Sequence, residues 1–438
     1  MPAPPPILVS PVTPATLADA QRTASSIAQR AANPFYDAPS LTMETSGSTG
    51  SPQAVTLPAS AVLASARATQ ERLDGPGRWV LALTPHRIAG FQVLLRAHLA
   101  EQAGVPRAFA TSLAEAFADT PESASIPVYI SVVPTQLHRV LAAGGPELEL
   151  LARCSAVLVG GAALDPVLHA RALAAHIPVI RTYGMTETCG GCVYDGQPLD
   201  GVNVRINEAG TIEIAGPMLA SGYQDGANDA FFEDNGIRWF RTHDHGEITA
   251  EGILTVQGRA DHVIITGGVN VAPEAVALAV RPALVDVLGS EPVEVCVIGI
   301  PDDEWGQAVT AVVEIPSHPG AGSHSVTLPV RDEGAEGPPG EGEFSPVDPA
   351  SLARIRTILS AQLGGPAAPR QVYVTSCLPR LISGKVDCQR VIAILTGTPG
   401  AGTSLTGSPV TTAGVTANTE NALHHRDTAP PHGPSSGH

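Results

Sequence analysis

The sequence has few aromatic residues, little charge and little cysteine, and each shortage excludes something. Aromatic residues make up 4% and charged residues 15% of the 438 positions, so the core must be built mainly from Ala, Val, Leu and Ile. Acidic side chains outnumber basic ones by 42 to 25, which gives a formal net charge of −17. A surface of this sign repels nucleic-acid phosphates, so no nucleic-acid partner is expected. The six cysteines are too scattered to form a disulfide framework.

Long apolar runs are also missing. No run reaches the roughly 18–20 residues that span a bilayer, so we expect no transmembrane segment. The first residues, MPAPPPILVSPVTP, lack the basic and apolar regions of a secretory signal. These absences predict a cytoplasmic protein.

The first half of the chain alternates short apolar runs with Ala- and Leu-rich stretches of helical period. Buried strands are predicted at 78–84, 126–132, 155–161 and 177–183. Helices are predicted near 58–74, 88–103, 134–143 and 165–176. Such alternation is typical of a layered α/β core with a largely parallel sheet.

The pattern changes after Pro198. A small antiparallel unit is predicted from short strands at 202–206, 211–215, 237–242 and 253–257. Further strands are predicted at 262–266, 293–300, 308–315 and 370–374, and helices at 273–281, 350–363 and 387–395. We therefore expect a large α/β N-terminal domain over residues 41–261 and a small α+β C-terminal domain over 262–395.

Three segments fall outside these two predicted domains. Residues 1–40 are rich in proline and are interpreted as a lead-in with one helix. Residues 316–348 are rich in Gly, Pro and acid, which predicts a disordered insertion because they cannot bury enough apolar surface. Residues 396–438 contain no aromatic residue and are predicted to be a disordered tail.

Five short motifs follow one another in a fixed order. They are TSGSTG (45–50), YGMTET (183–188), RTHDHGE (241–247), GRADHVIITGGVNVAPE (258–274) and ISGK (382–385). In this order they resemble the adenylate-forming superfamily of acyl-CoA synthetases, carrier-protein adenylation domains and luciferases. The resemblance implies a two-step reaction in which ATP activates a carboxylate and a thiol then captures it. It also implies that the C-terminal domain is a mobile lid.

The first motif suits an anionic phosphate. Its glycines let the backbone approach a ligand closely, and its hydroxyl groups add donors beside the main-chain N–H groups. The resemblance implies that it holds the β- and γ-phosphates of ATP through Thr45, Ser46, Gly47, Ser48, Thr49 and Gly50. The family pattern ends in Pro-Lys, whereas this chain has Pro52-Gln53, so one positive charge is missing.

The second motif follows a predicted strand, where α/β sheets place a ligand crevice. Tyr183 offers a flat face for adenine, Thr186 a hydroxyl for the α-phosphate, and Glu187 a hard oxygen ligand for Mg²⁺. By resemblance, Thr186 and Glu187 are catalytic, and GGAAL at 160–164 contacts adenine and the acyl group through its backbone. The resemblance also assigns Gly161, Ala162 and Thr182 to ATP, and Gly160, Gly184 and Met185 to the acyl substrate.

The remaining motifs complete the implied site. Asp244 matches the aspartate that accepts hydrogen bonds from the ribose hydroxyls, and Arg259 matches its partner. Asp261 matches the hinge between the domains. The resemblance further implies that Gly267 and Gly268 line the tunnel for the pantetheine arm of CoA, and that Lys385 reaches the α-phosphate during adenylation.

Two residue pairs invite other interpretations. His243 and His245 flank Asp244, but no third metal ligand is evident, and a catalytic zinc site normally needs three. Cys189 and Cys192 form a CxxC pair, but they lack the helix start and electropositive surroundings of a redox pair. We therefore expect these cysteines to pack near the acyl pocket.

Other segments bear on the substrate. Residues 85–97, 131–141 and 187–202 resemble the o-succinylbenzoate–CoA ligases of menaquinone synthesis, particularly the compact actinobacterial kind. His86 lies where that family places an aromatic-pocket residue, and Gly190 and Gly191 leave room for a planar aromatic acid. The resemblance implies a ligase acting on ATP, CoA and an aromatic carboxylic acid with Mg²⁺.

Three alternatives stay open. The chain could be a CoA ligase for another aryl or short acyl acid, or an adenylation domain that loads a carrier protein in trans. It could also be a degenerate nucleotide-binding protein, which only Gln53 suggests. A homodimer is left open as well.

Overall fold

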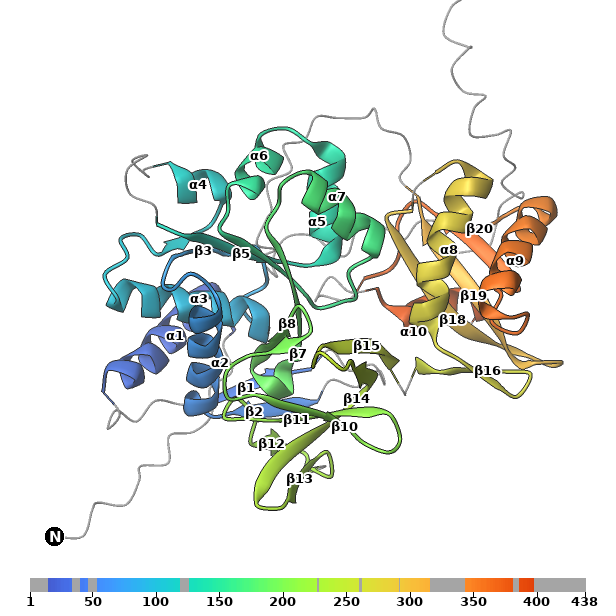
Figure 1. Ribbon diagram of the computed structural model, residues 1–438. Coiled ribbons are helices and arrows are strands. Elements are labelled where there is room, and N and C mark those ends of the chain that lie inside the picture. Colours follow the sequence, from blue (N-terminus) through green and yellow to red (C-terminus); the bar gives the residue numbers. More distant parts are fainter. Residues whose placement is uncertain are drawn as a thin grey trace, which may run out of the picture.

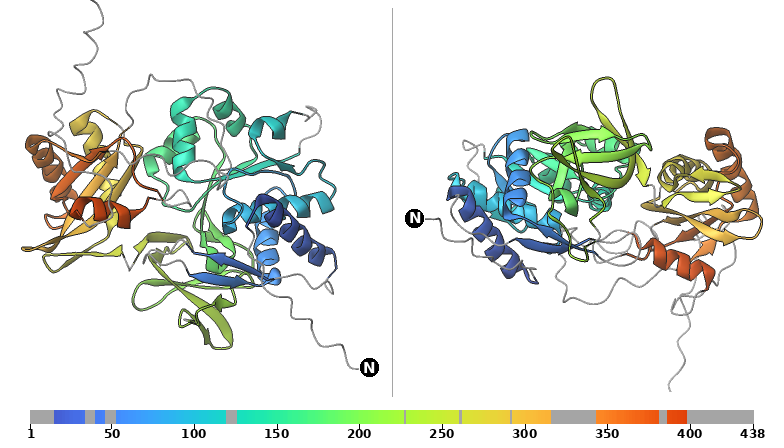
Figure 2. Two further views of the ribbon diagram at one scale, coloured as in Figure 1. Left: turned by 180° about the vertical axis from the view of Figure 1, so that it is seen from behind. Right: turned by 90° about the horizontal axis from the view of Figure 1, so that it is seen from below.

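The computed structural model describes residues 15–33, 40–45, 53–118, 126–226, 228–259, 262–290, 292–315, 343–380 and 386–397. These residues form a large N-terminal domain and a small C-terminal domain that lies beside it (Figure 1). The two views of Figure 2 show the same side-by-side arrangement. Among the described residues, no helix is both long enough and apolar enough to cross a membrane.

The centre of the large domain is a sheet with the described strand order β4-β3-β5-β6-β7-β8-β9. Its parallel strands are β3 (Arg78–Val80), β4 (Phe109–Ala110), β5 (Val128–Val132), β6 (Ala156–Val159) and β7 (Val179–Met185). Two antiparallel strands follow, β8 (Gly190–Tyr194) and β9 (Gln197–Pro198). The predicted parallel core is confirmed.

Helices cover both faces of this sheet. One layer contains α1 (Leu17–Ala32), α2 (Ala59–Arg72) and α3 (Ile88–Gln102). The other contains α4 (Leu113–Phe117), α5 (Pro134–Ala143), α6 (Pro146–Ala152) and α7 (Pro166–Ala174). Because successive strand residues point to opposite faces, Trp79 and Tyr129 pack with the first layer, whereas Val80 and Ile130 pack with the second.

Helix α1 corrects the predicted start of the large domain. Thr16 caps the helix by accepting a hydrogen bond from the Asp19 N–H at 3.1 Å. Ala20, Ala24 and Ile27 are fully buried in the same core as α2 and α3. The large domain therefore begins before residue 41, and the predicted lead-in contributes a packed helix.

Two smaller sheets lie below the central one in Figure 1. The first contains β1 (Leu41–Glu44), β2 (Ala54–Leu57) and β12 (Gly222–Tyr223). The second contains β10 (Asn203–Ile206), β11 (Thr211–Ala215), β13 (Phe231–Asp234), β14 (Ile237–Ile248) and β15 (Leu254–Arg259). The second sheet confirms the predicted antiparallel unit.

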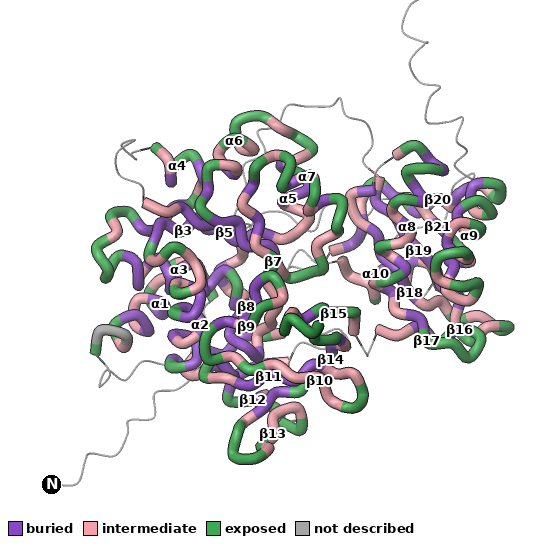
Figure 3. The backbone as a smooth tube through the Cα atoms, viewed as in Figure 1, coloured by how far each residue is buried: buried purple, intermediate pink, exposed green. Residues whose placement is uncertain are grey.

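The C-terminal domain is a mixed sheet between helices. Its strands are β16 (Ile264–Thr266), β17 (Val269–Val271), β18 (Glu294–Asp302), β19 (Gly306–Glu314), β20 (Ser345–Pro346) and β21 (Gln371–Thr375). Helices α8 (Pro273–Leu288) and α9 (Pro349–Leu363) pack on one face, and α10 (Cys388–Thr396) packs on the other. Figure 3 shows buried segments running through both domains.

Two predicted boundaries in this domain are wrong. Residues 343–348, assigned to the disordered insertion, form β20 and bury Phe344 in the core, while residues 316–342 lie outside the described part of the chain. Helix α8 was predicted to end at 281 but continues through Pro282 to Leu288. It continues because Val280 and Leu284 belong to one buried face, whereas Leu278, whose carbonyl loses its helical partner, is exposed.

Candidate active site

The carboxyl ends of β6 and β7 carry the first group of predicted residues. The Thr182 hydroxyl donates to the Val159 carbonyl at 3.3 Å, so β7 is held against the end of β6. A Cβ atom at Gly160 would lie 2.2 Å from the Thr182 Oγ, which explains why a glycine is needed there. Gly161 and Ala162 follow in an exposed loop. The backbone of this loop is therefore open to a ligand.

Tyr183 and Asp244 meet across two sheets. The Tyr183 hydroxyl donates to Oδ2 of Asp244 at 2.7 Å, and Nη1 of Arg259 lies 3.7 Å from Oδ1. Asp244 on β14 and Arg259 on β15 are direct cross-strand partners. Burial, followed by the charge of Asp244, raises the pKa of Tyr183 well above its usual value, so the phenol stays protonated. The structure thus brings together the three residues predicted for adenine and ribose.

Glu187 lies close to this group in the short helix η1 (Thr186–Thr188). Its side chain accepts a hydrogen bond from the Tyr223 hydroxyl at 2.8 Å, and the residue is only 8% exposed. Burial raises the pKa of Glu187 above its usual value. The Tyr223 hydrogen bond and the positive charge of Arg259 act in the opposite direction.

This environment fits a bound metal ion. A buried carboxylate is stable in its charged form only when a cation or several donors compensate for the lost hydration. Mg²⁺ prefers carboxylate, phosphate and water oxygens. Glu187 therefore has the donor chemistry and the burial that the predicted Mg²⁺ role requires.

Tyr223 was not predicted as a site residue. It lies on β12, and its backbone pairs with Val55 on β2, the strand that follows the TSGSTG motif. An aromatic residue in SGYQDG carries no recognisable pattern by itself. Only the pairing of β12 with β2 brings its hydroxyl to Glu187.

The phosphate-loop motif is described only at its ends. The Thr45 N–H donates to the Gln53 carbonyl at 2.8 Å, and the Gln53 N–H donates to the Thr45 hydroxyl at 3.3 Å. Gln53, which replaces the lysine of the family pattern, also reaches the Asp225 carboxylate at 3.5 Å. The predicted residues Ser46, Gly47, Ser48, Thr49 and Gly50 lie outside the described residues.

Most of the residues predicted for the acyl pocket lie on β7, on β8 and just before α3. A Cβ atom at Gly184 would lie 2.1 Å from the Gly190 carbonyl oxygen, so the two strands require glycine at this contact. The space beside Gly190 is bordered by Gln92, Ser65 and Ile88. Ile88 begins α3 two residues after the half-buried His86, which places the predicted pocket residue at the same end of that helix.

Gln92 is a second polar residue that the sequence did not reveal. Its amide N–H₂ donates to the Cys189 carbonyl at 2.8 Å and to the Val62 carbonyl at 3.1 Å. Its amide oxygen is buried and has no hydrogen-bond partner among the described residues. The signal was present as a lone polar residue in the apolar run FQVLL, but it was indistinguishable from a structural glutamine.

The CxxC cysteines are part of the core. Cys189 and Cys192 are both buried, and burial raises the pKa of Cys192 to about 12 and that of Cys189 still further. Both thiols therefore stay protonated and act as small apolar side chains. Their expected place near the acyl pocket stays a prediction.

The residues predicted for CoA lie in the C-terminal domain. Gly267 and Gly268 form the tight turn between β16 and β17, with φ angles of +55° and +76° that favour glycine. A Cβ atom at Gly267 would lie 2.7 Å from the Trp305 ring, whereas the space beside Gly268 is open. Asp261 and Lys385, the predicted hinge and catalytic lysine, lie outside the described residues.

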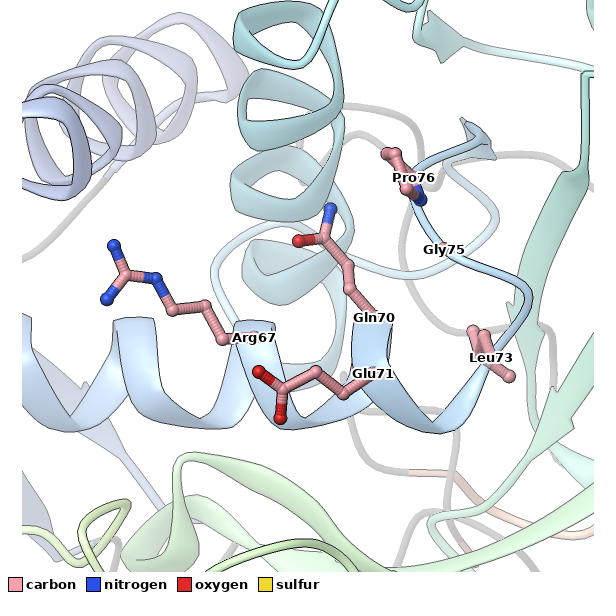
Figure 4. Close-up of a pocket in the computed structure, with 6 residues that line it drawn as sticks. All are labelled: Arg67, Gln70, Glu71, Leu73, Gly75 and Pro76. Atoms are coloured by element: carbon pink, nitrogen blue, oxygen red, sulfur yellow. The ribbon is translucent and has the colours of Figure 1, made fainter.

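A cavity of about 390 Å³ lies elsewhere on the large domain. Figure 4 shows that Arg67, Gln70 and Glu71 approach it from α2, and that Leu73, Gly75 and Pro76 line it from the following loop. None of these residues belongs to the group around Glu187 and Asp244. The cavity is therefore separate from the candidate active site.

Comparisons with known proteins identify the family. A family model described as "AMP-binding enzyme" matches residues 7–224. A Mycobacterium tuberculosis protein named "Probable 2-succinylbenzoate–CoA ligase" is 38% identical over 369 residues, covering 82% of this chain and 85% of the relative. The chain belongs to the AMP-binding enzyme family.

Further similarities agree with this membership of the AMP-binding enzyme family. A 2-succinylbenzoate–CoA ligase from Enterococcus faecalis is 27% identical over 372 residues, covering 80% of this chain and 68% of the relative. The structure of o-succinylbenzoate CoA synthetase (MenE) from Bacillus subtilis with OSB-AMP matches with a TM-score of 0.58 and 24% identity. That match covers 80% of this chain and 68% of the other, and it confirms the predicted fold of a large α/β domain with a small α+β domain.

Proposed function

We propose that this chain is an AMP-forming 2-succinylbenzoate–CoA ligase. The observation that carries the proposal is the extended match to the M. tuberculosis relative of that name, which covers 85% of that protein. The arrangement of Tyr183, Glu187 and Asp244 at the ends of the strands supports the same chemistry. The residue roles that follow are proposals.

The first half-reaction activates the acid. An oxygen of the substrate carboxylate attacks the α-phosphorus of ATP, the bond to the bridging oxygen breaks, and pyrophosphate leaves. Asp244 binds the ribose hydroxyls, Tyr183 stacks on adenine, and Thr186 contacts the α-phosphate. Mg²⁺, when held by Glu187, would neutralise charge on the triphosphate.

Lys385 is proposed to stabilise the charge that develops at the α-phosphate. It is the only lysine in the sequence, so no other ammonium group of this chain can replace it. A cation that is already in position when charge develops stabilises the transition state more than the ground state. The missing lysine at position 53 makes this single ammonium group more important.

The second half-reaction forms the thioester. The sulfur of CoA attacks the acyl carbonyl carbon, the carbon–oxygen bond to AMP breaks, and AMP leaves with the bonding electrons. The turn at Gly267 and Gly268 would leave a passage for the pantetheine arm. Its open side, beside Gly268, supports this role.

The acid itself is assigned by the relatives and supported by the pocket. Gly190 leaves space next to Gln92, whose buried amide oxygen has no partner among the described residues. This combination fits a flat apolar ring with one polar contact. Other relatives include a sulfoacetate–CoA ligase and a medium/long-chain-fatty-acid–CoA ligase, so these acids are the appropriate competitors.

The decisive experiment is mass spectrometry of the products formed from ATP and CoA with 2-succinylbenzoate, sulfoacetate or a medium-chain fatty acid. We expect the 2-succinylbenzoyl thioester together with AMP and pyrophosphate. Glu187→Gln keeps the side-chain shape and removes the charge, so it is the matched inactive control. A thioester from another acid only would overturn the substrate, whereas adenylate formation without any CoA thioester would favour the carrier-loading alternative.

Assembly and compartment are proposed separately. All six cysteines are free, which agrees with the predicted reducing cytoplasm. A homodimer stays a prediction, and light scattering coupled to size-exclusion chromatography would test it.

A further inference from the structure

Two cysteines far apart in the sequence meet inside the C-terminal domain. Sγ of Cys296 on β18 lies 3.4 Å from Sγ of Cys388, the first residue of α10. Cys296 is 4% exposed and lies in the core cluster that α10 completes, whereas Cys388 is half-buried. The two thiols therefore touch, and only Cys388 can be reached from solvent.

The surroundings make Cys388 the more reactive of the two. It stands at a helix N-terminus, where main-chain N–H groups favour a thiolate. The hydrogen bond between the two thiols, aided by the charge of His262, lowers the pKa of Cys388, while burial and the charges of Asp387 and Glu274 oppose the effect. The same hydrogen bond raises the pKa of Cys296 well above its usual value.

This arrangement differs from that of the other buried thiols. Burial raises the pKa of Cys154, Cys189 and Cys192, and none of them is placed at the N-terminus of a helix of comparable length. A reactive, accessible cysteine beside a buried partner is the usual arrangement of a peroxide-sensing pair. The CxxC sequence, by contrast, lacks a reactive member.

We propose that Cys388 and Cys296 form a reversible disulfide when the protein meets hydrogen peroxide. The Cys388 sulfur attacks one peroxide oxygen, the O–O bond breaks, and the leaving hydroxide is protonated to water. The Cys296 sulfur then attacks the resulting Cys388 sulfenic acid, the S–O bond breaks, and a second water leaves with the Cys296 proton. Two thiols are thus oxidised by two electrons, and one peroxide is reduced to two waters.

The geometry requires only a small movement. The sulfur atoms must approach from 3.4 Å to the disulfide bond length of about 2.05 Å, a change that side-chain rotation and a slight shift of α10 can supply. The chain immediately before Cys388 is already anchored, because the Asp387 N–H donates to the Pro379 carbonyl at 2.9 Å and Arg380 forms a β-bridge with Val386.

The disulfide would act at the base of the segment that carries Lys385. Arg380 and Val386 close that segment, and Cys388 follows two residues later. A covalent link from Cys388 to β18 would add a bond that does not open to the hydrogen bonds that already hold Arg380, Val386 and Asp387, so the oxidised protein should adenylate more slowly. This consequence rests on the proposed function, whereas the disulfide itself does not.

The test is peptide mapping of the full-length protein under non-reducing conditions after treatment with hydrogen peroxide. We expect one cross-linked pair of peptides containing Cys296 and Cys388, lost again after dithiothreitol. Cys296→Ser and Cys388→Ser should each abolish it, and Cys296→Ser should accumulate sulfenic acid at Cys388, trapped by dimedone. Cys377→Ser is the matched control, because the thiol of this cysteine of the same domain donates to the Leu378 carbonyl at 3.7 Å, and it should leave the cross-link unchanged.

The outcomes separate the two claims. Oxidation of Cys388 without a link to Cys296, or a cross-link that survives in Cys296→Ser, would overturn the disulfide. A disulfide that forms fully but leaves the adenylation rate unchanged would overturn the restraint on the Lys385 segment and leave the modification site standing. Inactivity of the untreated enzyme toward 2-succinylbenzoate would contradict the proposed function alone, because the cross-link is measured without a substrate.

Discussion

Buried charges are arranged differently in the candidate active site and in the small domain. In the large domain, Asp244 and Glu187 each accept one short hydrogen bond from a tyrosine. In the small domain, Arg380 lies 2.7 Å from Glu314 and 3.9 Å from Glu294 within the fold. Asp244 and Glu187 have a neutral tyrosine as their close donor and Arg259 only at longer range, so much of their charge stays available to a ligand, whereas Glu314 is neutralised by an arginine in direct contact. The first arrangement serves binding and the second serves stability.

Lys385 is a small-domain charge with a proposed role in catalysis and not in stability, so its replacement should have the largest effect. Lys385→Ala should slow acyl-adenylate formation by about 10²–10³-fold, since a preorganised charge at a developing oxyanion is worth roughly 3–4 kcal/mol. The variant should still convert supplied acyl-adenylate and CoA to thioester. Single-turnover measurement of each half-reaction provides the test.

The reciprocal variant is Gly268→Leu, which should form adenylate that accumulates without reaching CoA. Gly268→Asn is its control, because asparagine tolerates a positive φ without adding a long side chain. If Lys385→Ala and Gly268→Leu lose both half-reactions equally while their melting temperatures stay unchanged, the division of roles between lysine and turn is wrong.

Breaking the ion pair of the small domain should affect stability. Arg380→Met leaves Glu314 buried without its cation, which should cost about 3 kcal/mol in the free energy of unfolding. The double variant Arg380→Met/Glu314→Gln should recover part of this loss, because no uncompensated charge remains. Urea unfolding of the three proteins measures the difference. An unchanged midpoint for Arg380→Met would remove the contrast between the domains.

The tyrosine beside Glu187 should affect the pH dependence of catalysis. Tyr223→Phe removes a hydrogen bond that lowers the pKa of Glu187, so this pKa should rise above its already raised value. The carboxylate is then lost at a higher pH, and the acid limb of kcat/KM for pyrophosphate release should move to higher pH. A hydrogen bond to a charged group is worth about 1.5–3 kcal/mol, and the shift should be largest at limiting Mg²⁺.

Tyr194→Phe is the matched control for this variant. Tyr194 also makes buried hydrogen bonds, to Thr69 at 3.0 Å and to Arg96, but none of its described contacts is with Glu187. Its loss should leave the pH profile in place. An equal shift in both variants would mean that the effect is structural.

The smallest effect is expected where the two domains meet. Nε of Arg281 on α8 lies 3.6 Å from Oδ2 of Asp165, while Oδ1 of Asp165 caps α7. Arg281→Gln removes the contact and keeps the cap, so it should change the ratio of the two half-reaction rates by less than about fivefold, or 1 kcal/mol. A larger change would mean that this pair controls the domain arrangement.

The sequence predicted those helices and strands whose residues follow a single periodic pattern of apolar side chains. The parallel core and helices α2, α3, α5 and α7 followed from alternating apolar runs, and β11 matched the predicted 211–215. The errors arose where tertiary packing overrides local composition. Proline-rich surroundings concealed the packing of the predicted lead-in helix, α1, into the core. Acidic and glycine-rich neighbours concealed Phe344, and Pro282 suggested a helix end that the buried face of α8 overrides.

The residues of the candidate site also fall into two groups, those that lie in a sequence motif and those that do not. Tyr183, Glu187, Asp244 and Arg259 were found because they stand in motifs, and the structure brings them together. Tyr223 and the Cys296–Cys388 pair could not be found, because each contact joins segments with no common pattern. Such contacts depend on strand pairing and helix docking, which only the folded chain provides.

Helix α1 has a practical consequence for work with fragments of this protein. Its buried alanines at positions 20, 24 and 28 are four residues apart, so they form a flat stripe against which α3 packs closely. A fragment that began at the first strand would expose the apolar face of α3 to water and would be prone to aggregate. Expression fragments should therefore begin ahead of Thr16, the cap of this helix.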